Sequence, residues 1–103
     1  LEKKMAWKQI ITYTRPNTGV AWTITPNNCE THIINTYEDT GKSVSFTKVL
    51  SEDGLTLTKT RTFDSESSLN EWRNDSVLAT ATNSITSDNT SKSITKTSQI
   101  GDL

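Results

Sequence analysis

The chain has 103 residues and a formal net charge of -1, so it has room for one domain and no charge excess that would attract nucleic acid or an anionic membrane. Hydrophobic residues make up only 31% of it, which predicts a thin core. No apolar run approaches the length of a membrane span. We expect a single domain over residues 5–103, with residues 1–4 lying upstream of a natural start at Met5.

The compartment is inferred from what the sequence lacks. No apolar segment follows the first lysines, so no signal peptide is expected, and Cys29 is the only cysteine, so no intrachain disulfide can form. A cytoplasmic location is therefore the default expectation.

The first predicted strand covers residues 7–15, which carry apolar side chains on both faces. Pro16 ends it, and the next residues have the composition of a turn. The short β-branched and aromatic segment 20–25 is either a hairpin partner of this strand or an extended connection.

A helix is predicted next, with two alternative starts. Thr25 can cap it with Pro26 at the first helical position, or it begins one step later at Asn27, with a carboxylate three residues on. The spacing of Cys29, Ile33 and Tyr37 gives a narrow apolar stripe, with Ile34 beside it, and Gly41 ends the segment.

The middle of the chain predicts a β-hairpin of residues 43–50 and 55–63, and its register has two alternatives. A two-residue Asp53-Gly54 loop pairs Lys48 with Lys59, an unfavourable meeting of like charges. A four-residue loop over 51–54 pairs Lys48 with Leu57 instead, and we favour this longer loop.

A second helix is predicted from residues 64–66, with Leu69 and Trp72 as its anchors. Residues 74–76 interrupt it, and Asp75 or Ser76 can cap a shorter helix beyond. Residues 84–90 have the composition of a loop, and 92–100 form a weak closing strand.

The element order is therefore β, α, β, β, α, β. It predicts an α+β, ferredoxin-like fold with a four-stranded antiparallel sheet. Right-handed crossovers place both helices on one face of this sheet and leave the other face bare.

This order over residues 7–100, together with the sequence Thr-Arg-Thr-Phe-Asp-Ser-Glu at 60–66 followed by Leu69 and Trp72, resembles the small dimeric α+β barrel proteins. That group includes antibiotic biosynthesis monooxygenase-like domains and uncharacterised environmental relatives. The resemblance implies a homodimer that pairs through the helix-free sheet face. The His-bearing signatures of the heme-binding and catalytic members have no counterpart here, so the catalytic residues stay unknown.

Cys29 and His32, the only cysteine and the only histidine, are three residues apart on the first predicted helix. An imidazole beside a thiol can activate it as a nucleophile, but no third group that would orient the pair is identifiable. We therefore interpret Cys29 as a core residue with His32 at the edge of the stripe. One Cys and one His cannot fill a zinc shell, so neither a metal nor another cofactor is expected.

Aromatic residues are numerous for so small a core. They either fill the interior or line a pocket between helices and sheet for a small apolar ligand. In the second case the predicted site consists of Tyr13, Trp22, His32 and Trp72, because the rings meet at the layer boundary and His32 adds a titratable group.

Two further patterns, a threonine stripe and a group of basic residues, are interpreted without a binding role. The threonines at 56, 58, 60 and 62 alternate as in ice-binding ladders, but only one predicted strand carries them cleanly. β-Propensity on a solvated or subunit-covered face explains them better. A patch of Lys48, Lys59, Arg61, Lys92 and Lys96 lacks the aromatic signature of RNA-binding sheets, so no nucleic-acid partner is expected.

These observations predict a small dimeric module that binds a ligand or partner without catalysis. The alternative is a cofactor-independent monooxygenase-like enzyme that uses an aromatic-lined pocket between helices and sheet.

Overall fold

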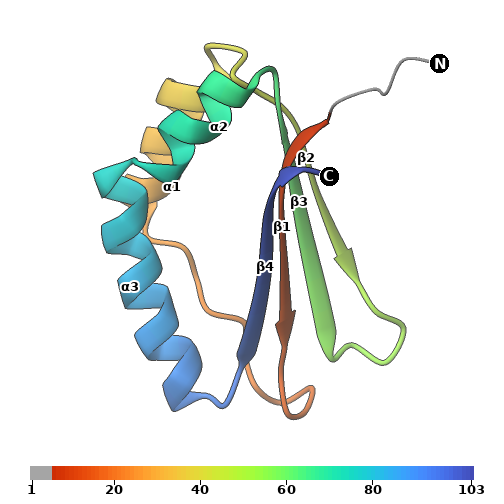
Figure 1. Ribbon diagram of the computed structural model, residues 1–103. Helices are drawn as coiled ribbons and strands as arrows, with labels where there is room; N and C mark the ends of the chain where they lie inside the picture. Colours follow the sequence, from red (N-terminus) through yellow and green to blue (C-terminus); the bar gives the residue numbers. More distant parts are fainter. Residues whose placement is uncertain (1–5) are drawn as a thin grey trace, which may run out of the picture.

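The computed structural model describes residues 6–103, so the predicted start at Met5 and the residues before it lie outside the described part. It has two layers, a four-stranded antiparallel sheet and a set of helices on one face of it (Figure 1). The elements in chain order are β1 (Trp7–Thr14), α1 (Asn27–Ile33), η1 (Ile34–Glu38), β2 (Ser43–Leu50), β3 (Thr56–Phe63), α2 (Glu66–Arg73), α3 (Ser76–Ser91) and β4 (Thr95–Asp102). The predicted α+β class is confirmed.

The strand order is β2-β3-β1-β4, which places β1 and β3 in the centre. The connection from β1 to β2 through α1 passes over β3, and the connection from β3 to β4 through α2 and α3 passes over β1. Segment 20–25 belongs to the first of these connections and forms no strand, which decides between its two predicted roles. In the described chain, no helix is both long and apolar enough to cross a membrane.

The hairpin register is the one that the sequence argument rejected. Leu50 lies opposite Leu57, and Lys48 lies directly opposite Lys59. The turn fixes this register locally, because Gly54 takes a φ of 74° and the Asp53 carboxylate accepts from the Leu55 amide at 3.0 Å. Two like charges are therefore brought together on the helix-facing side of the sheet.

The predicted threonine stripe on β3 is wider than the sequence indicated. Thr58 pairs with Thr12 of β1, and Thr12 pairs in turn with Thr97 of β4. A second row consists of Thr56, Thr14 and Thr95. The expectation that one strand alone carries the ladder is wrong, because single-sequence alternation does not reveal how strands align. We call these two rows, with Thr60 and Thr62, the threonine face; no helix covers it (Figure 1).

The first helix begins at Asn27, with Pro26 as its cap residue and no side-chain hydrogen bond at the cap, so the Thr25 cap was wrong. It continues into the π-helical turn η1, where the Asp39 amide donates to the Ile34 carbonyl at 2.8 Å. This wider turn holds Tyr37 fully buried, and Gly41 then ends the segment with a φ of 78°.

The second helical region is divided, as the polar break at 74–76 predicted. Ser65 Oγ accepts from the Ser68 amide at 3.1 Å and caps α2, while Asp75 caps α3. However, α3 continues to Ser91, so the predicted loop over 84–90 is wrong. Its low-propensity residues satisfy themselves within the helix, since Thr90 Oγ1 donates to the Thr86 carbonyl.

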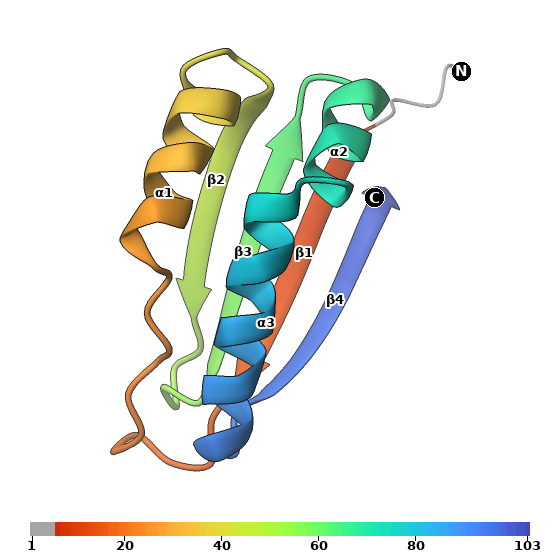
Figure 2. The same cartoon turned by 90° about the vertical axis from the view of Figure 1, so that its left-hand side faces the viewer.

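The core lies in the half of the molecule that holds α1, α2 and the start of α3 (Figure 2). Cys29, Tyr37, Leu78 and Ala81 form its buried centre, and Trp72 packs against them. The rings of Tyr37 and Trp72 meet edge to face at 4.9 Å between centroids. Beside this core, Ala81 and Thr82 of α3 present short side chains toward the sheet, and the interior there is not filled.

Candidate ligand-binding cavity

A cavity of about 380 Å³ lies between the helix layer and the sheet. It lies where α3 presents Ala81 and Thr82, which are smaller than the apolar side chains that a close-packed interior would need. The cavity is open to solvent beside β2, where Ile34 and Phe46 are 45% and 40% exposed. Its volume is within the range of small-molecule sites.

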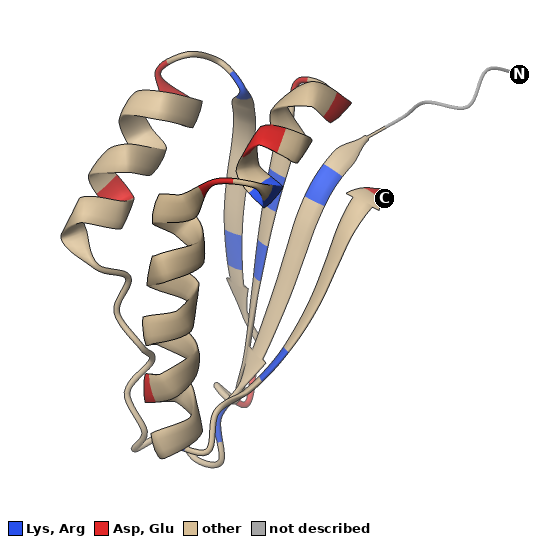
Figure 3. Ribbon diagram, turned by 60° about the vertical axis from the view of Figure 1, so that its left-hand side comes forward, with Lys and Arg blue, Asp and Glu red and all other residues tan. Residues whose placement is uncertain are grey.

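Four basic side chains line the sheet side of this cavity, and we call Lys48, Lys59, Arg61 and Lys96 the basic floor. They come from β2, β3 and β4, whereas the acidic residues lie mainly on the helices and their caps (Figure 3). The lining includes two carboxylates, Glu30 and Glu38. The cavity therefore has an excess of positive charge.

Arg61 is the neutralised member of the basic floor. Its Nη1 donates to Glu38 Oε2 at 3.0 Å and to Ser43 Oγ at 2.8 Å. The guanidinium also lies 4.3 Å from the ring centroid of Phe46 and 5.0 Å from that of Trp72. Buried between two rings and paired with a carboxylate, Arg61 is held in a single position.

Lys59 has a different environment. Its ammonium lies 5.4 Å from the centroid of the Tyr13 ring, and no carboxylate of residues 6–103 lies within ion-pair distance of it. Burial and the nearby charge of Lys48 lower the pKa of Lys59, while Glu30 acts in the opposite direction. Among residues 6–103, this partly desolvated amine has no ion-pair partner, although the charge of Glu30 acts on it.

The aromatic residues of the predicted site are distributed around this cavity. Tyr13 and Trp72 line it directly, and Trp72 Nε1 donates to Gln9 Oε1 at 3.1 Å. Trp22 lines a small adjoining recess that shares Tyr13 and Lys59 with the cavity. Its ring is covered by the Arg15 guanidinium at 4.5 Å. Three of the four predicted site residues are thus brought to one region.

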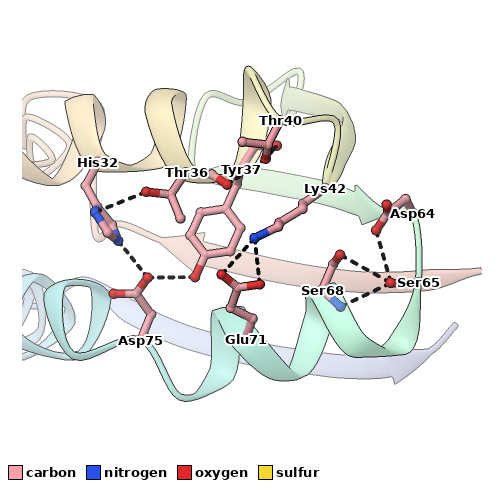
Figure 4. A network of polar contacts seen from close by, with 10 residues as sticks. All are labelled: His32, Thr36, Tyr37, Thr40, Lys42, Asp64, Ser65, Ser68, Glu71 and Asp75. Atoms are coloured by element: carbon pink, nitrogen blue, oxygen red, sulfur yellow. Dashed lines mark hydrogen bonds and ion pairs between the residues drawn. The ribbon is translucent and has the colours of Figure 1, made fainter.

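His32, the fourth predicted residue, is not among the lining residues of the cavity and belongs to a hydrogen-bonded cluster (Figure 4). Its Nε2 lies 2.6 Å from Asp75 Oδ2, and the same oxygen accepts from the Tyr37 hydroxyl at 2.6 Å. The other carboxylate oxygen accepts from the Val77 and Leu78 amides at the start of α3. We call His32, Tyr37 and Asp75 the Asp75 cluster.

Electrostatics at the Asp75 cluster favour the ionised carboxylate. Burial by itself raises the pKa of Asp75, but the hydrogen bonds from Tyr37 and His32 outweigh it, so that the pKa lies below its ordinary value of 3.8. Burial and the hydrogen bond to Asp75 raise the pKa of Tyr37 strongly. The buried side-chain polar atoms of the cluster all have hydrogen-bond partners, and the cluster joins α1 and η1 to the start of α3.

Cys29 is buried on α1, in the core and at the edge of the cavity, as predicted for a core residue. His32 is hydrogen-bonded to Asp75 and Thr36, and no contact joins it to the thiol. Burial, together with the charges of Asp75 and Glu30, raises the pKa of Cys29. A protonated, buried thiol is a poor nucleophile.

The basic floor was not recognised as a site in the sequence, although its residues were noted as a surface patch. The available signal was the alternation on β3, which places Lys59 and Arg61 on the same face as Leu57 and Phe63. Charged residues on the apolar face of a strand require partners or a cavity.

Within residues 6–103, no three His, Cys, Asp or Glu side chains are gathered as a metal site would require. Comparison with known proteins adds no assignment, since no family model, no curated protein and no solved structure matches the chain.

Proposed function

We propose that this protein is a small, non-catalytic ligand-binding module. Its ligand is an amphipathic molecule with an apolar or aromatic body and one anionic group. The body lies against Tyr13, Ile33 and Trp72, and the anion lies at Lys48 and Lys59. The observation that carries the proposal is the cavity of about 380 Å³, in which the Lys59 amine faces aromatic walls and has no ion-pair partner among residues 6–103.

The free-energy cost of placing two lysines together in the cavity supports this interpretation. A like-charge pair directly across two strands is unfavourable, and a partly buried ammonium loses hydration. Such violations of local preference concentrate at functional sites, where a bound group offsets them. An anion between Lys48 and Lys59 would supply the charge that the protein leaves out.

The test compares 2-naphthoate with the neutral 2-naphthamide, by chemical-shift perturbation on labelled protein. We expect naphthoate to shift amides of β3 and α3 and to bind about tenfold more tightly than the amide, which corresponds to one partly desolvated charge interaction. Lys59→Met should remove this preference. Lys8→Met, which deletes the same charge on the other face of the sheet, is the matched control. Equal binding of the two probes would contradict the proposal.

The second part of the proposal concerns the finer fold and the assembly. We infer a ferredoxin-like arrangement, because each helical crossover passes over one strand; the divided second helix and the π-helical turn are its departures from a simple two-helix layer. In the dimeric α+β barrel proteins that the sequence resembles, two such sheets pair face to face. We propose that the threonine face pairs in this way with a second copy.

Support for the dimer comes from the composition of that face. The threonines in the middle of this face are short and uncharged, and Lys8 lies toward one end of β1, so two such faces can approach closely over their centres. Sedimentation equilibrium at micromolar concentration should give twice the mass of 11.5 kDa. Thr58→Lys, at the middle of the face, should return the protein to a monomer. A wild-type monomer throughout that range would exclude this assembly.

The cofactor-independent monooxygenase-like enzyme remains the alternative, favoured by the aromatic lining of the cavity. It requires turnover rather than retention of a ligand. Oxygen uptake with a polycyclic phenol that binds in the naphthoate assay separates the two functions.

A further inference from the structure

A nucleophilic amine is the feature of the cavity that simple ligand binding does not use. Lys59 lies in the middle of β3, with Lys48 opposite it on β2 and the Tyr13 ring 5.4 Å from its ammonium. Arg61, its neighbour on the same face, is engaged with Glu38. The amine is therefore held at the cavity floor with no ion-pair partner among the residues that the structure describes.

The charges around Lys59 come from every element that faces the cavity. They are Lys48 on β2, Arg61 on β3, Lys96 on β4, Glu30 with the Cys29 thiol on α1, and Glu38 on η1; Tyr13 on β1 adds a neutral phenol, and α3 contributes no titratable lining residue. Arg61 and Glu38 compensate each other. Burial and Lys48 lower the pKa of Lys59 against the effect of Glu30, which increases the free amine near neutral pH.

We propose that Lys59 captures small carbonyl compounds bearing an anionic group, such as oxo-acids and aromatic aldehyde acids, as a reversible imine. This inference rests on the proposed function, because the anion is to be held by Lys48 in the same cavity. The nitrogen lone pair adds to the carbonyl carbon, and the carbon–oxygen π bond opens to give a carbinolamine. Loss of water, which carries away both amine hydrogens and the carbonyl oxygen, leaves the imine with no change in oxidation state.

Borohydride-type reduction makes this step measurable. The protein is treated with 4-formylbenzoate and cyanoborohydride at neutral pH, and the modified lysines are mapped by peptide mass spectrometry. We expect Lys59 to be labelled at least about fivefold faster than Lys8 or Lys96, since it combines more free amine with an anchored carbonyl. Benzaldehyde, which lacks the anionic group, should lose most of this preference.

Two variants test the separate roles of Lys59 and Lys48 in the labelling. Lys59→Arg retains the charge and should abolish the preferred adduct, while Lys48→Met should reduce the advantage of 4-formylbenzoate over benzaldehyde. In a pH series, labelling of Lys59 should rise at lower pH than labelling of Lys8. Equal labelling of all lysines, or a preferred adduct that persists in Lys59→Arg, would overturn the inference.

Failure of this inference is distinguishable from failure of the proposed function. If 2-naphthoate binds in the cavity but Lys59 shows no preferred labelling, the imine is excluded and the binding module stands. If naphthoate does not bind and labelling is uniform, both proposals fall.

Discussion

The Asp75 cluster and the basic floor lie on the same side of the sheet, yet their charges are treated in opposite ways. In the Asp75 cluster one carboxylate accepts hydrogen bonds from two side chains and two backbone amides. In the basic floor, Lys48 and Lys59 face each other with no carboxylate in ion-pair contact within the described chain. A satisfied cluster stabilises the fold, whereas an unbalanced one favours a ligand that completes it.

The largest change in stability is expected when the carboxylate of Asp75 is removed. Asp75→Ala deletes the cap of α3 and leaves the buried Tyr37 hydroxyl without its acceptor, so we expect a loss of about 3 kcal/mol in the free energy of unfolding. Urea denaturation measures it. Asp39→Ala, at an exposed carboxylate after η1, is the control and should change stability by less than about 0.5 kcal/mol.

If Asp75→Ala does not fold, Tyr37→Phe provides the milder version. It removes one hydrogen bond and should cost about 1 kcal/mol. A cost near zero in both variants would show that the Asp75 cluster is not what joins α1 to α3.

A second prediction concerns pH. Because the pKa of Asp75 is lower in the folded chain than its ordinary value of 3.8, its ionisation contributes stability that is fully present above that value and is lost as pH falls through the folded-state pKa. The difference in unfolding free energy between wild type and Asp75→Asn should shrink as the pH falls below the ordinary value of 3.8. Urea titrations at a series of pH values follow it, and a difference that grows in acid would reverse the assigned sign.

A smaller loss is expected at Cys29, where the core meets the cavity. Cys29→Ala should cost about 1 kcal/mol, because it trims one buried side chain beside space that already exists. The wild-type thiol should react slowly with thiol reagents near neutral pH, since its pKa is raised. Thr31→Ala, on the exposed side of α1, is the comparison variant. Rapid labelling of Cys29 would restore the nucleophile hypothesis.

Features that depend on residues close together in the sequence could be predicted, whereas features that depend on distant residues could not. The presence of the four strands, a cap at Asp75 or Ser76 and the Gly41 terminus depend on neighbouring residues and are confirmed, although the closing strand, predicted over 92–100, spans Thr95–Asp102. The alignment of β2 with β3 depends on the turn between them, and the sequence allows a two-residue or a four-residue loop there. The longer loop was favoured, so Lys48 was placed opposite Leu57 instead of Lys59. The cavity depends on the distance between layers, which no local pattern encodes.

The same difference between local and distant contacts explains which residues of the candidate site were predicted correctly. Tyr13 and Trp72 were placed at the layer boundary by alternation and helical spacing, and both line the cavity. His32 was assigned there because it lies at the edge of the apolar stripe of its helix and could add a titratable group to the site. Its partner Asp75 lies 43 residues later, so its contact could not be foreseen from the spacing on its own helix.

The smallest expected change in stability is a gain rather than a loss. It tests most directly the difference between the Asp75 cluster and the basic floor. Lys48→Met removes one of two like charges that face each other, so it should raise the free energy of unfolding by about 0.5 kcal/mol. It should also raise the pKa of Lys59, because a neighbouring positive charge that lowers it is gone. Side-chain NMR titration of labelled lysine measures the second change. Lys48→Arg keeps the charge and should leave both quantities near their wild-type values, while Lys8→Met controls for the loss of a lysine elsewhere on the sheet. If Lys48→Met instead lowers stability while Lys8→Met does not, the facing lysines are not under repulsion, and the argument for an anion between them loses its physical basis.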